Sequence, residues 1–209
     1  MKPACAVIVF AKAPVAGAVK TRLVGALGAA GAARLAARML ESTAACALEA
    51  EVGPVEVCCA PDRSHAAFAA LASRRALTLT EQGEGDLGQR MHRALERALA
   101  SQPAAIAIGT DAPELDAIYL REAAAALGRH DAVIGPAVDG GYALIGLRRA
   151  APALFEGIDW STSRVLAQTR ERLERLGFSW AELAPLHDID EPADLCHVPA
   201  GWAPLPLQE

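Results

Sequence analysis

Charged residues cluster in a short segment near the start of the chain, where they could hold phosphates. Residues 11–23 (AKAPVAGAVKTRL) place Lys12, Lys20 and Arg22 around Gly17. The chain has three lysines against seventeen arginines, so two lysines in one loop indicate a specific use of the ammonium group. A flexible loop with three cations after a buried strand suits the phosphates of a nucleotide. Its spacing matches neither a Walker loop nor a Rossmann fingerprint, and a solvated basic loop is the alternative.

A single aspartate ends the apolar run in the middle of the chain. Asp111 follows residues 104–109 and precedes Pro113, which stops the strand and opens the next helix. A carboxylate at the end of a buried strand is well placed to bind a hard divalent cation, and the cation in turn binds a diphosphate. The alternative is that Asp111 caps a helix.

Two further aspartates lie near the end of the chain in residues 187–195 (HDIDEPADL). Alternation along an extended segment puts Asp188 and Asp190 on the same side. These carboxylates could complete a metal site begun by Asp111. A final helix that starts at Pro192 is the alternative.

The segment 136–147 (PAVDGGYALIGL) places Asp139 before two glycines, between two apolar runs. Such a sequence could be only a hairpin turn. Equally, the glycines would let the backbone approach a ligand while Asp139 presents a carboxylate to an acceptor hydroxyl. The residues alone leave both interpretations open.

Two weaker signals could line a ligand pocket. In residues 83–90 (GEGDLGQR), Gln89 could contact a base or sugar at the start of a helix, although Asp86 as a helix cap explains the segment equally well. Trp160 could form one wall of an acceptor pocket, although the residues after it resemble a helix N-cap.

Apolar runs of strand length alternate with segments of helical periodicity. This order, and strands that are apolar on both faces, predict an α/β sandwich with a largely parallel sheet. Ligands of such sheets bind outside the carboxyl ends of the strands, where the charged segments above fall. The expected strands are 4–11, 55–60, 77–80, 104–109, 132–136, 142–147 and 183–187, and the expected helices are 32–49, 64–74, 87–100, 114–127 and 161–176.

Length and composition narrow the class of protein. The chain of 209 residues predicts one domain over 1–198 followed by a Pro-rich tail over 199–209, and the apolar tail around Trp202 could pack on a second copy in a homodimer. A net charge of −5 without a basic block argues against a nucleic-acid partner and leaves small molecules. No stretch is expected to be long enough to span a membrane.

The cysteines and the first apolar run bear on the compartment. The five cysteines show no metal-site or disulfide spacing, so they predict buried thiols in a reducing cytoplasm. Residues 2–13 imitate a short signal peptide with an A-x-A site. Because the run is short and β-branched at its centre, a buried first strand is the interpretation that we adopt.

As an ordered set, four motifs carry a resemblance that spans about residues 5 to 197. They are K-x-P-x-x-G-x-x-K-T-R-L from Lys12, G-T-D-x-P from Gly109, P-x-x-D-G-G-Y-x-L-I-G-L from Pro136 and D-I-D-x-P-x-D-L from Asp188. The set resembles a small bacterial family of nucleotide-diphospho-sugar transferase proteins known as arsenosugar-biosynthesis-type or radical-SAM/selenodomain-associated glycosyltransferases. The wider GT-A fold also includes phospholactate and molybdenum-cofactor guanylyltransferases.

This resemblance implies a three-layer α/β sandwich with a mixed, mainly parallel sheet, the GT-A fold, and a nucleotide over its amino-terminal half. It also implies site residues: Lys12, Lys20 and Arg22 match the loop that grips the nucleotide phosphates, and Asp111 and Asp190 match the aspartates that bind Mg²⁺ or Mn²⁺, with Asp188 as a second candidate. Together with the interpretation of the motifs above, we predict that Gly17, Gln89 and Thr110 also contact the nucleotide and that Asp139 and Lys20 are catalytic. The sequence departs from the Asp-x-Asp usual in glycosyltransferases, because a single Asp precedes Ala-Pro.

The leading hypothesis is a cytoplasmic, metal-dependent transferase that uses a nucleoside diphosphate sugar and a small-molecule acceptor. In the alternative reaction, a nucleotidyl transfer from a nucleoside triphosphate, pyrophosphate leaves. A third hypothesis, a non-catalytic nucleotide-binding module, predicts binding that EDTA does not affect.

Overall fold

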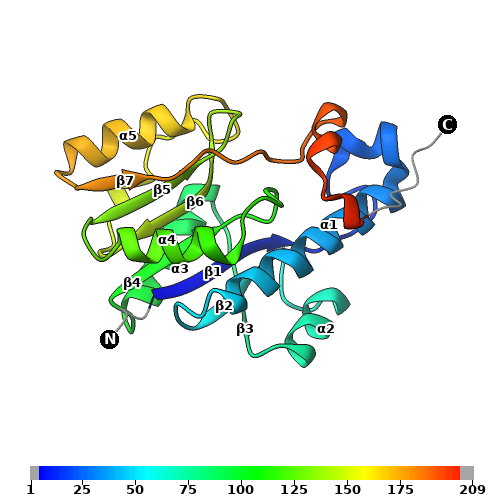
Figure 1. The fold of residues 1–209 in the computed structure, drawn as a ribbon, viewed down its shortest axis with the longest axis horizontal. Coiled ribbons are helices and arrows are strands. Elements are labelled where there is room, and N and C mark those ends of the chain that lie inside the picture. Colours follow the sequence, from blue (N-terminus) through cyan, green and yellow to red (C-terminus); the bar gives the residue numbers. More distant parts are fainter. Residues whose placement is uncertain (1–4, 203–209) are drawn as a thin grey trace.

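A seven-stranded sheet forms the centre of the protein, which a computed structural model describes over residues 5–202 (Figure 1). The strand order is β3-β2-β1-β4-β6-β5-β7. Within the described residues only β6 runs antiparallel to its neighbours, so the sheet is mixed and mainly parallel. The strands are β1 (Cys5–Lys12), β2 (Val55–Ala60), β3 (Thr78–Glu81), β4 (Ala104–Ile108), β5 (Ala132–Pro136), β6 (Tyr142–Leu147) and β7 (Trp180–Glu182).

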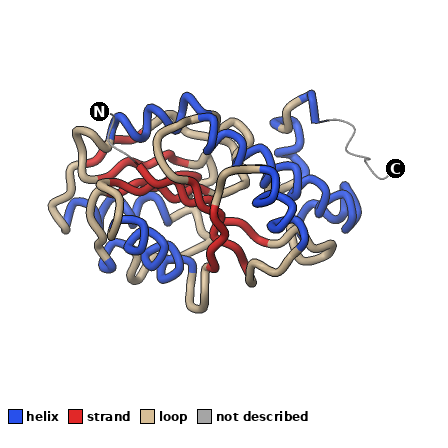
Figure 2. The backbone as a smooth tube through the Cα atoms, turned by 90° about the horizontal axis from the view of Figure 1, so that it is seen from below, coloured by secondary structure: helices blue, strands red, loops and turns tan. Residues whose placement is uncertain are grey.

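Helices cover both faces of the sheet, which gives the predicted three layers (Figure 2). Helices α1 (Val24–Glu49), α2 (Ala66–Arg74) and α4 (Ala117–Ala126) pack on one face, and α3 (Leu87–Leu99) and α5 (Val165–Arg175) pack on the other. Short 3₁₀ helices are η1 (Thr21–Leu23), η2 (Pro152–Leu154), η3 (Pro192–His197) and η4 (Ala200–Trp202).

Strand β1 shows why both faces must be covered. Val7 and Val9 belong to the core under α1, α2 and α4, whereas Ile8 belongs to the core under α3 and α5. All three side chains are fully buried. Because successive strand residues point to opposite faces, a strand that is apolar throughout requires a helical layer on each side. The predicted three-layer α/β architecture is confirmed.

The first part of α1 packs against the last described part of the chain. Leu23, Leu27, Leu35 and Met39 form a third core cluster with Ile189. The helix kinks at Gly28, whose φ is 68°. Figure 1 shows this region at one end of the molecule, where the red 3₁₀ helices lie beside the blue start of α1. The C-terminal segment is thereby held next to the loop that follows β1.

The segment Thr21–Glu49 is long and apolar enough, at a mean hydropathy of 1.3, to cross a membrane by length and composition. The expectation that no stretch has this length is therefore wrong. The many alanines of the helix raise its hydropathy, and three of its leucines are in the core: Leu27, Leu35 and Leu40 are at most 3% exposed. A helix buried in the core of a globular protein is equally apolar, so this hydropathy does not by itself indicate a membrane span.

Two predicted boundaries differ from the structure for local reasons. The last strand is Trp180–Glu182 rather than 183–187, because Pro185 cannot donate to the ladder. After β7, an isolated bridge joins Leu186 to Ala137. Helix α4 begins at Ala117, not near Pro113, because the side chain of Asp116 caps it by accepting a hydrogen bond from the backbone N–H of Tyr119.

Predictions for segments outside the sheet also differ in part from the structure. The N-cap of α5 is Arg164 without a side-chain cap, so the residues after Trp160 do not serve as its predicted N-cap run. Cys5, Cys58 and Cys59 are buried thiols as expected, but Cys196 is exposed. Residues 199–202 of the predicted tail pack on α1 through Trp202, and the rest of the tail lies outside the described residues.

Candidate active site

The candidate site lies where the order of the strands reverses. The chain winds from β1 to β2 and β3 on one side and then returns to add β4 on the other side of β1. Loops that follow adjacent parallel strands diverge at such a point and leave a crevice at the carboxyl ends. The loop 13–20 follows β1 and the turn 109–116 follows β4, so the predicted cations and Asp111 arrive at the same edge.

Three charged side chains from distant parts of the sequence meet there. The ammonium Nζ of Lys20 lies 2.5 Å from Asp111 Oδ1 and 3.0 Å from Asp190 Oδ1. It also donates a hydrogen bond of 2.7 Å to the carbonyl of Ile189. The Lys20 side chain is 7% exposed, whereas about half of each carboxylate remains open to solvent (47% and 48%). The two carboxylates therefore share one cation and keep free oxygens.

Backbone contacts bring the C-terminal segment to this position. The N–H of Ile189 donates to the carbonyl of Asp111 at 2.8 Å. The Ile189 side chain is fully buried against α1, so its neighbours Asp188 and Asp190 project to the opposite side of the extended chain. The 3₁₀ helix η3 begins at Pro192 with a capping box formed by Glu191 and Asp194. The alternative for this segment, a capped helix that starts at Pro192, is thus found as a 3₁₀ helix, and it occurs together with the approach of Asp190 to Asp111 through Lys20.

Asp188 lies deeper than the other two carboxylates. Burial, reinforced by the negative charges of Asp111, Asp139 and Asp190, raises the pKa of Asp188 to about 7. Its Oδ1 atom is buried and has no hydrogen-bond partner among the described residues. An orphaned carboxylate oxygen beside two other carboxylates is an incomplete site for a cation.

The donor set fits a hard divalent metal ion. Burial by itself would lower the pKa of the Lys20 ammonium, but the adjacent carboxylates of Asp111 and Asp190 outweigh burial and raise it above its ordinary value. The site therefore attracts positive charge strongly. Carboxylate oxygens are the ligands that Mg²⁺ and Mn²⁺ prefer, and the free Oδ1 of Asp188 offers one more.

Asp139 lies in the turn between β5 and β6, at the same edge of the sheet. Its Oδ1 accepts a hydrogen bond of 2.8 Å from the N–H of Gly141, so it shapes the hairpin. It also lies close enough to Asp188 to raise the pKa of that residue. The two interpretations of this motif, a turn and a carboxylate directed at the site, are therefore compatible.

The predicted cationic loop divides into different environments. Lys12, at the end of β1, and Gly17, in the loop with a φ of +80°, are exposed. Arg22 does not join the acidic cluster: its Nη1 lies 3.3 Å from Glu191 Oε1, and the side chain is 68% exposed. Among the three predicted cations, only Lys20 contacts the metal-site candidates.

Gln89 and Thr110 lie at the ends of two elements on this edge. Gln89 is the third residue of α3, and its side chain accepts a hydrogen bond from the N–H of Asp86 in a capping box. The helix-cap interpretation of this segment is therefore realised. Thr110 is half-buried beside Asp111, and Trp160 contacts Tyr142 edge-on with 6.4 Å between ring centroids. Their contacts with a ligand stay predictions.

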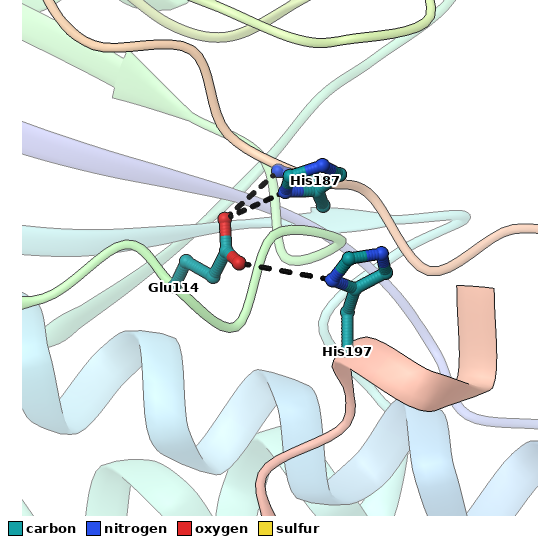
Figure 3. A group of neighbouring side chains, drawn as sticks. All are labelled: Glu114, His187 and His197. Atoms are coloured by element: carbon teal, nitrogen blue, oxygen red, sulfur yellow. Dashed lines mark hydrogen bonds and ion pairs between the residues drawn. The ribbon is translucent and has the colours of Figure 1, made fainter.

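Sequence reasoning missed one cluster of side chains next to the site. Glu114, His187 and His197 converge from the turn after β4, the C-terminal segment and the end of η3 (Figure 3). Nothing in the sequence indicated this cluster, because Glu114 and His187 are 73 positions apart.

A hollow of about 250 Å³ lies away from both groups of side chains. It is lined by Glu56, Thr80 and Arg97, among others, near the start of β2.

The fold is that of nucleotide-diphospho-sugar transferases. A structure from Desulfovibrio desulfuricans G20, described as a candidate nucleotide-diphospho-sugar transferase, superposes with a TM-score of 0.84 and 29% identity and covers 92% of this chain and 85% of that chain. A family model described as "Uncharacterized protein conserved in bacteria (DUF2064)" matches residues 43–162. The chain belongs to this bacterial family. No curated protein matches the sequence.

More distant structures share the fold. Glucosyl-3-phosphoglycerate synthase from Mycobacterium tuberculosis, in complex with Mn²⁺, UDP and glucosyl-3-phosphoglycerate, has a TM-score of 0.57 at 11% identity and covers 93% of this chain and 75% of its own. The 2-C-methyl-D-erythritol 4-phosphate cytidylyltransferase from Thermus thermophilus has a TM-score of 0.55 at 18% identity, with coverage of 94% and 97%. The fold thus accommodates both glycosyl and nucleotidyl transfer.

Proposed function

We propose that the protein is a metal-dependent transferase of a nucleotide-activated group, and that its donor is a nucleoside diphosphate sugar. The observation that carries the proposal is the meeting of Asp111 and Asp190 on the Lys20 ammonium at the edge where the strand order reverses. The likeness to the D. desulfuricans structure supports the class of donor. The resemblance of the motifs to arsenosugar-biosynthesis-type and radical-SAM/selenodomain-associated glycosyltransferases supports the sugar.

In this proposal the acidic cluster of Asp111, Asp188 and Asp190 holds Mg²⁺ or Mn²⁺. The ion, when bound, neutralises negative charge on the diphosphate. The glucosyl-3-phosphoglycerate synthase that shares the fold has Mn²⁺ and UDP in its structure, which supports this choice of ion and nucleotide. Lys20, buried beside the carboxylates, adds positive charge next to the departing diphosphate.

The remaining residues of the proposed site contribute to binding and to proton transfer. Lys12, Gly17 and Arg22 contact the nucleotide from the loop after β1, and Gln89 and Thr110 contact it from α3 and from the end of β4. Asp139 orients or deprotonates the acceptor hydroxyl. The acceptor oxygen then bonds to the anomeric carbon of the sugar as the bond to the diphosphate breaks.

A second candidate is nucleotidyl transfer from a nucleoside triphosphate. The single Asp111, in place of an Asp-x-Asp pair, favours it, and so does the likeness in fold to a cytidylyltransferase. In this reaction the same cations stabilise charge on the attacked α-phosphate, and pyrophosphate leaves.

A thermal-shift screen of nucleotides and nucleotide sugars, with and without Mn²⁺, tests the proposal. Ligand at about 100 times its Kd stabilises the folded state by about 2.7 kcal/mol, so the correct donor raises the melting temperature only when the metal is present. Asp111→Ala should abolish the shift and Asp139→Ala should leave it. Equal shifts in wild type and Asp111→Ala, or shifts that EDTA does not change, would contradict a metal-dependent site.

Product analysis with the donor so identified separates the two reactions. Release of a nucleoside diphosphate with transfer of the sugar supports the glycosyltransferase. Release of pyrophosphate from a nucleoside triphosphate excludes it and supports nucleotidyl transfer. A donor that binds but is never turned over supports the non-catalytic module.

A further inference from the structure

Outside the acidic cluster, three side chains gather on the opposite side of the C-terminal segment. His187 Nδ1 lies 3.1 Å from Glu114 Oε2, and His197 Nδ1 lies 4.0 Å from Glu114 Oε1 (Figure 3). The N–H of His187 also donates to Glu114 Oε2 at 3.1 Å. The three side chains are between 35% and 40% exposed, so an ion from solvent can reach them.

The spacing of these donor atoms is close to that of a metal centre. One potential ligand atom from each of Glu114, His187 and His197 lies within 4.8 Å of the others. Bond lengths of about 2.0 to 2.2 Å at tetrahedral Zn²⁺ put neighbouring ligand atoms about 3.3 to 3.5 Å apart. The separation of 3.1 Å from His187 to Glu114 Oε2 is close to that value, and the separation of 4.0 Å from His197 to Glu114 Oε1 is longer, so a small movement of His197 would complete the site.

The two imidazole rings lie face to face. The rings of His187 and His197 are stacked, with centroids 4.0 Å apart and an angle of 9° between their planes. An imidazole nitrogen without a proton is a good ligand for a borderline metal ion, and the stacking holds the two rings close enough to share one ion. Because the rings are partly exposed, rotation about their terminal side-chain bonds can turn a nitrogen of each ring toward one ion.

We propose that Glu114, His187 and His197 form a second metal site that binds a borderline transition ion, Zn²⁺ in the first place. Two imidazoles and one carboxylate select such an ion, whereas the all-carboxylate cluster of Asp111, Asp188 and Asp190 selects a harder one. The fourth position is open to water. This site does not depend on the proposed transferase activity.

Occupancy of the site would fasten the C-terminal segment to the turn after β4. His187 directly precedes Asp188, and Glu114 lies three positions after Asp111. A bond from each to one ion therefore fixes the two backbone segments that carry the acidic cluster. The expected consequence is a structural zinc site that stabilises the fold next to the candidate active site.

Zinc titration of the metal-free protein tests the site. In isothermal titration with Zn²⁺, in excess Mg²⁺ to occupy the acidic cluster, the wild type should bind one equivalent. The double variant His187→Ala/His197→Ala should lose it, and His130→Ala, which alters a histidine beyond the C-terminal end of α4, should retain it. Co²⁺ in place of Zn²⁺ should give the visible absorption of a tetrahedral site in the wild type alone.

Two more variants keep the test decisive. Glu114→Gln preserves shape but removes the charged ligand, so zinc affinity should fall by about tenfold or more even if the histidine variant does not fold. Asp111→Asn/Asp190→Asn should keep zinc binding while it loses Mn²⁺ binding. The proposal is overturned if the wild type binds no zinc, if Glu114→Gln binds it as tightly as the wild type, or if the aspartate variant is the one that loses it.

Discussion

The Lys20 ammonium lies 3.0 Å from Asp190 Oδ1, although 170 positions separate the two residues. This ion pair joins the loop after the first strand to the last segment of the described chain. Lys20 also pairs with Asp111, so one buried ammonium group neutralises two carboxylates that are each about half exposed.

Lys20→Met should destabilise the metal-free protein. The substitution leaves the carboxylates of Asp111 and Asp190 without their shared cation. We expect the free energy of unfolding to fall by roughly 1–3 kcal/mol. This is less than for a fully buried pair, because both carboxylates are about half exposed. Thermal melts in EDTA measure the loss. Added Mn²⁺ should raise the melting temperature of the variant more than that of the wild type.

Lys12→Met is the matched control, since it removes an exposed lysine of the same loop region. We expect its stability to stay within about 0.5 kcal/mol of the wild type. If Lys20→Met were as stable in EDTA as Lys12→Met, the ion pairs of Lys20 would have no structural role.

Asp188→Asn should change how stability depends on pH. The pKa of Asp188 is raised from 3.8 to about 7 in the folded state by burial and neighbouring carboxylates, so folding favours its protonated form. The contribution of Asp188 to the free energy of unfolding is therefore fully present below pH 4, and it is lost as the pH rises through 7. This pKa shift corresponds to a change of at most about 4 kcal/mol in the free energy of unfolding.

The wild type should therefore lose stability relative to Asp188→Asn between pH 4 and pH 7, and the difference should be constant at higher pH. Urea unfolding of both proteins in EDTA at pH 5, 6, 7 and 8 measures it. A difference that is independent of pH would mean that Asp188 titrates normally and is not enclosed by the acidic cluster.

Gly140→Ala should disrupt the hairpin that carries Asp139. The φ of Gly140 is +92°, and a Cβ there would collide with the carbonyl oxygen of Ser163. We expect a loss of about 3 kcal/mol or more, because backbone strain adds to the clash. Gly177→Ala has a φ of +63° and open space around its Cβ, so calorimetry should show a loss of only about 1 kcal/mol.

Much of the fold could be predicted from the sequence because its signals are local. The β2, β5 and β6 boundaries match the apolar runs, and α3 begins at its predicted residue, since Asp86 and Gln89 form a capping box. The last strand could not be placed, because Leu183 and Leu186 look like strand residues and the interruption comes from Pro185.

The candidate site was predictable to the extent that topology determines it. Residues after parallel strands must share one edge, which brings Lys20 and Asp111 close together. No comparable rule of sheet topology predicts that Glu114, His187 and His197 lie close together. Their proximity depends on how η3 folds back along the molecule, and a histidine in a turn carries no periodic signal.

Ile189→Ala should loosen the segment that presents the acidic cluster. The side chain is fully buried against α1 and separates Asp188 from Asp190, so its loss should cost about 2–4 kcal/mol. Hydrogen exchange should increase over 187–197, and Mn²⁺ affinity should fall because the carboxylates lose their fixed position. Ile118→Ala, at a side chain that is 61% exposed on α4, should change neither measurement. Weaker Mn²⁺ binding in Ile118→Ala, or unchanged binding in Ile189→Ala, would show that this anchor does not position the carboxylates.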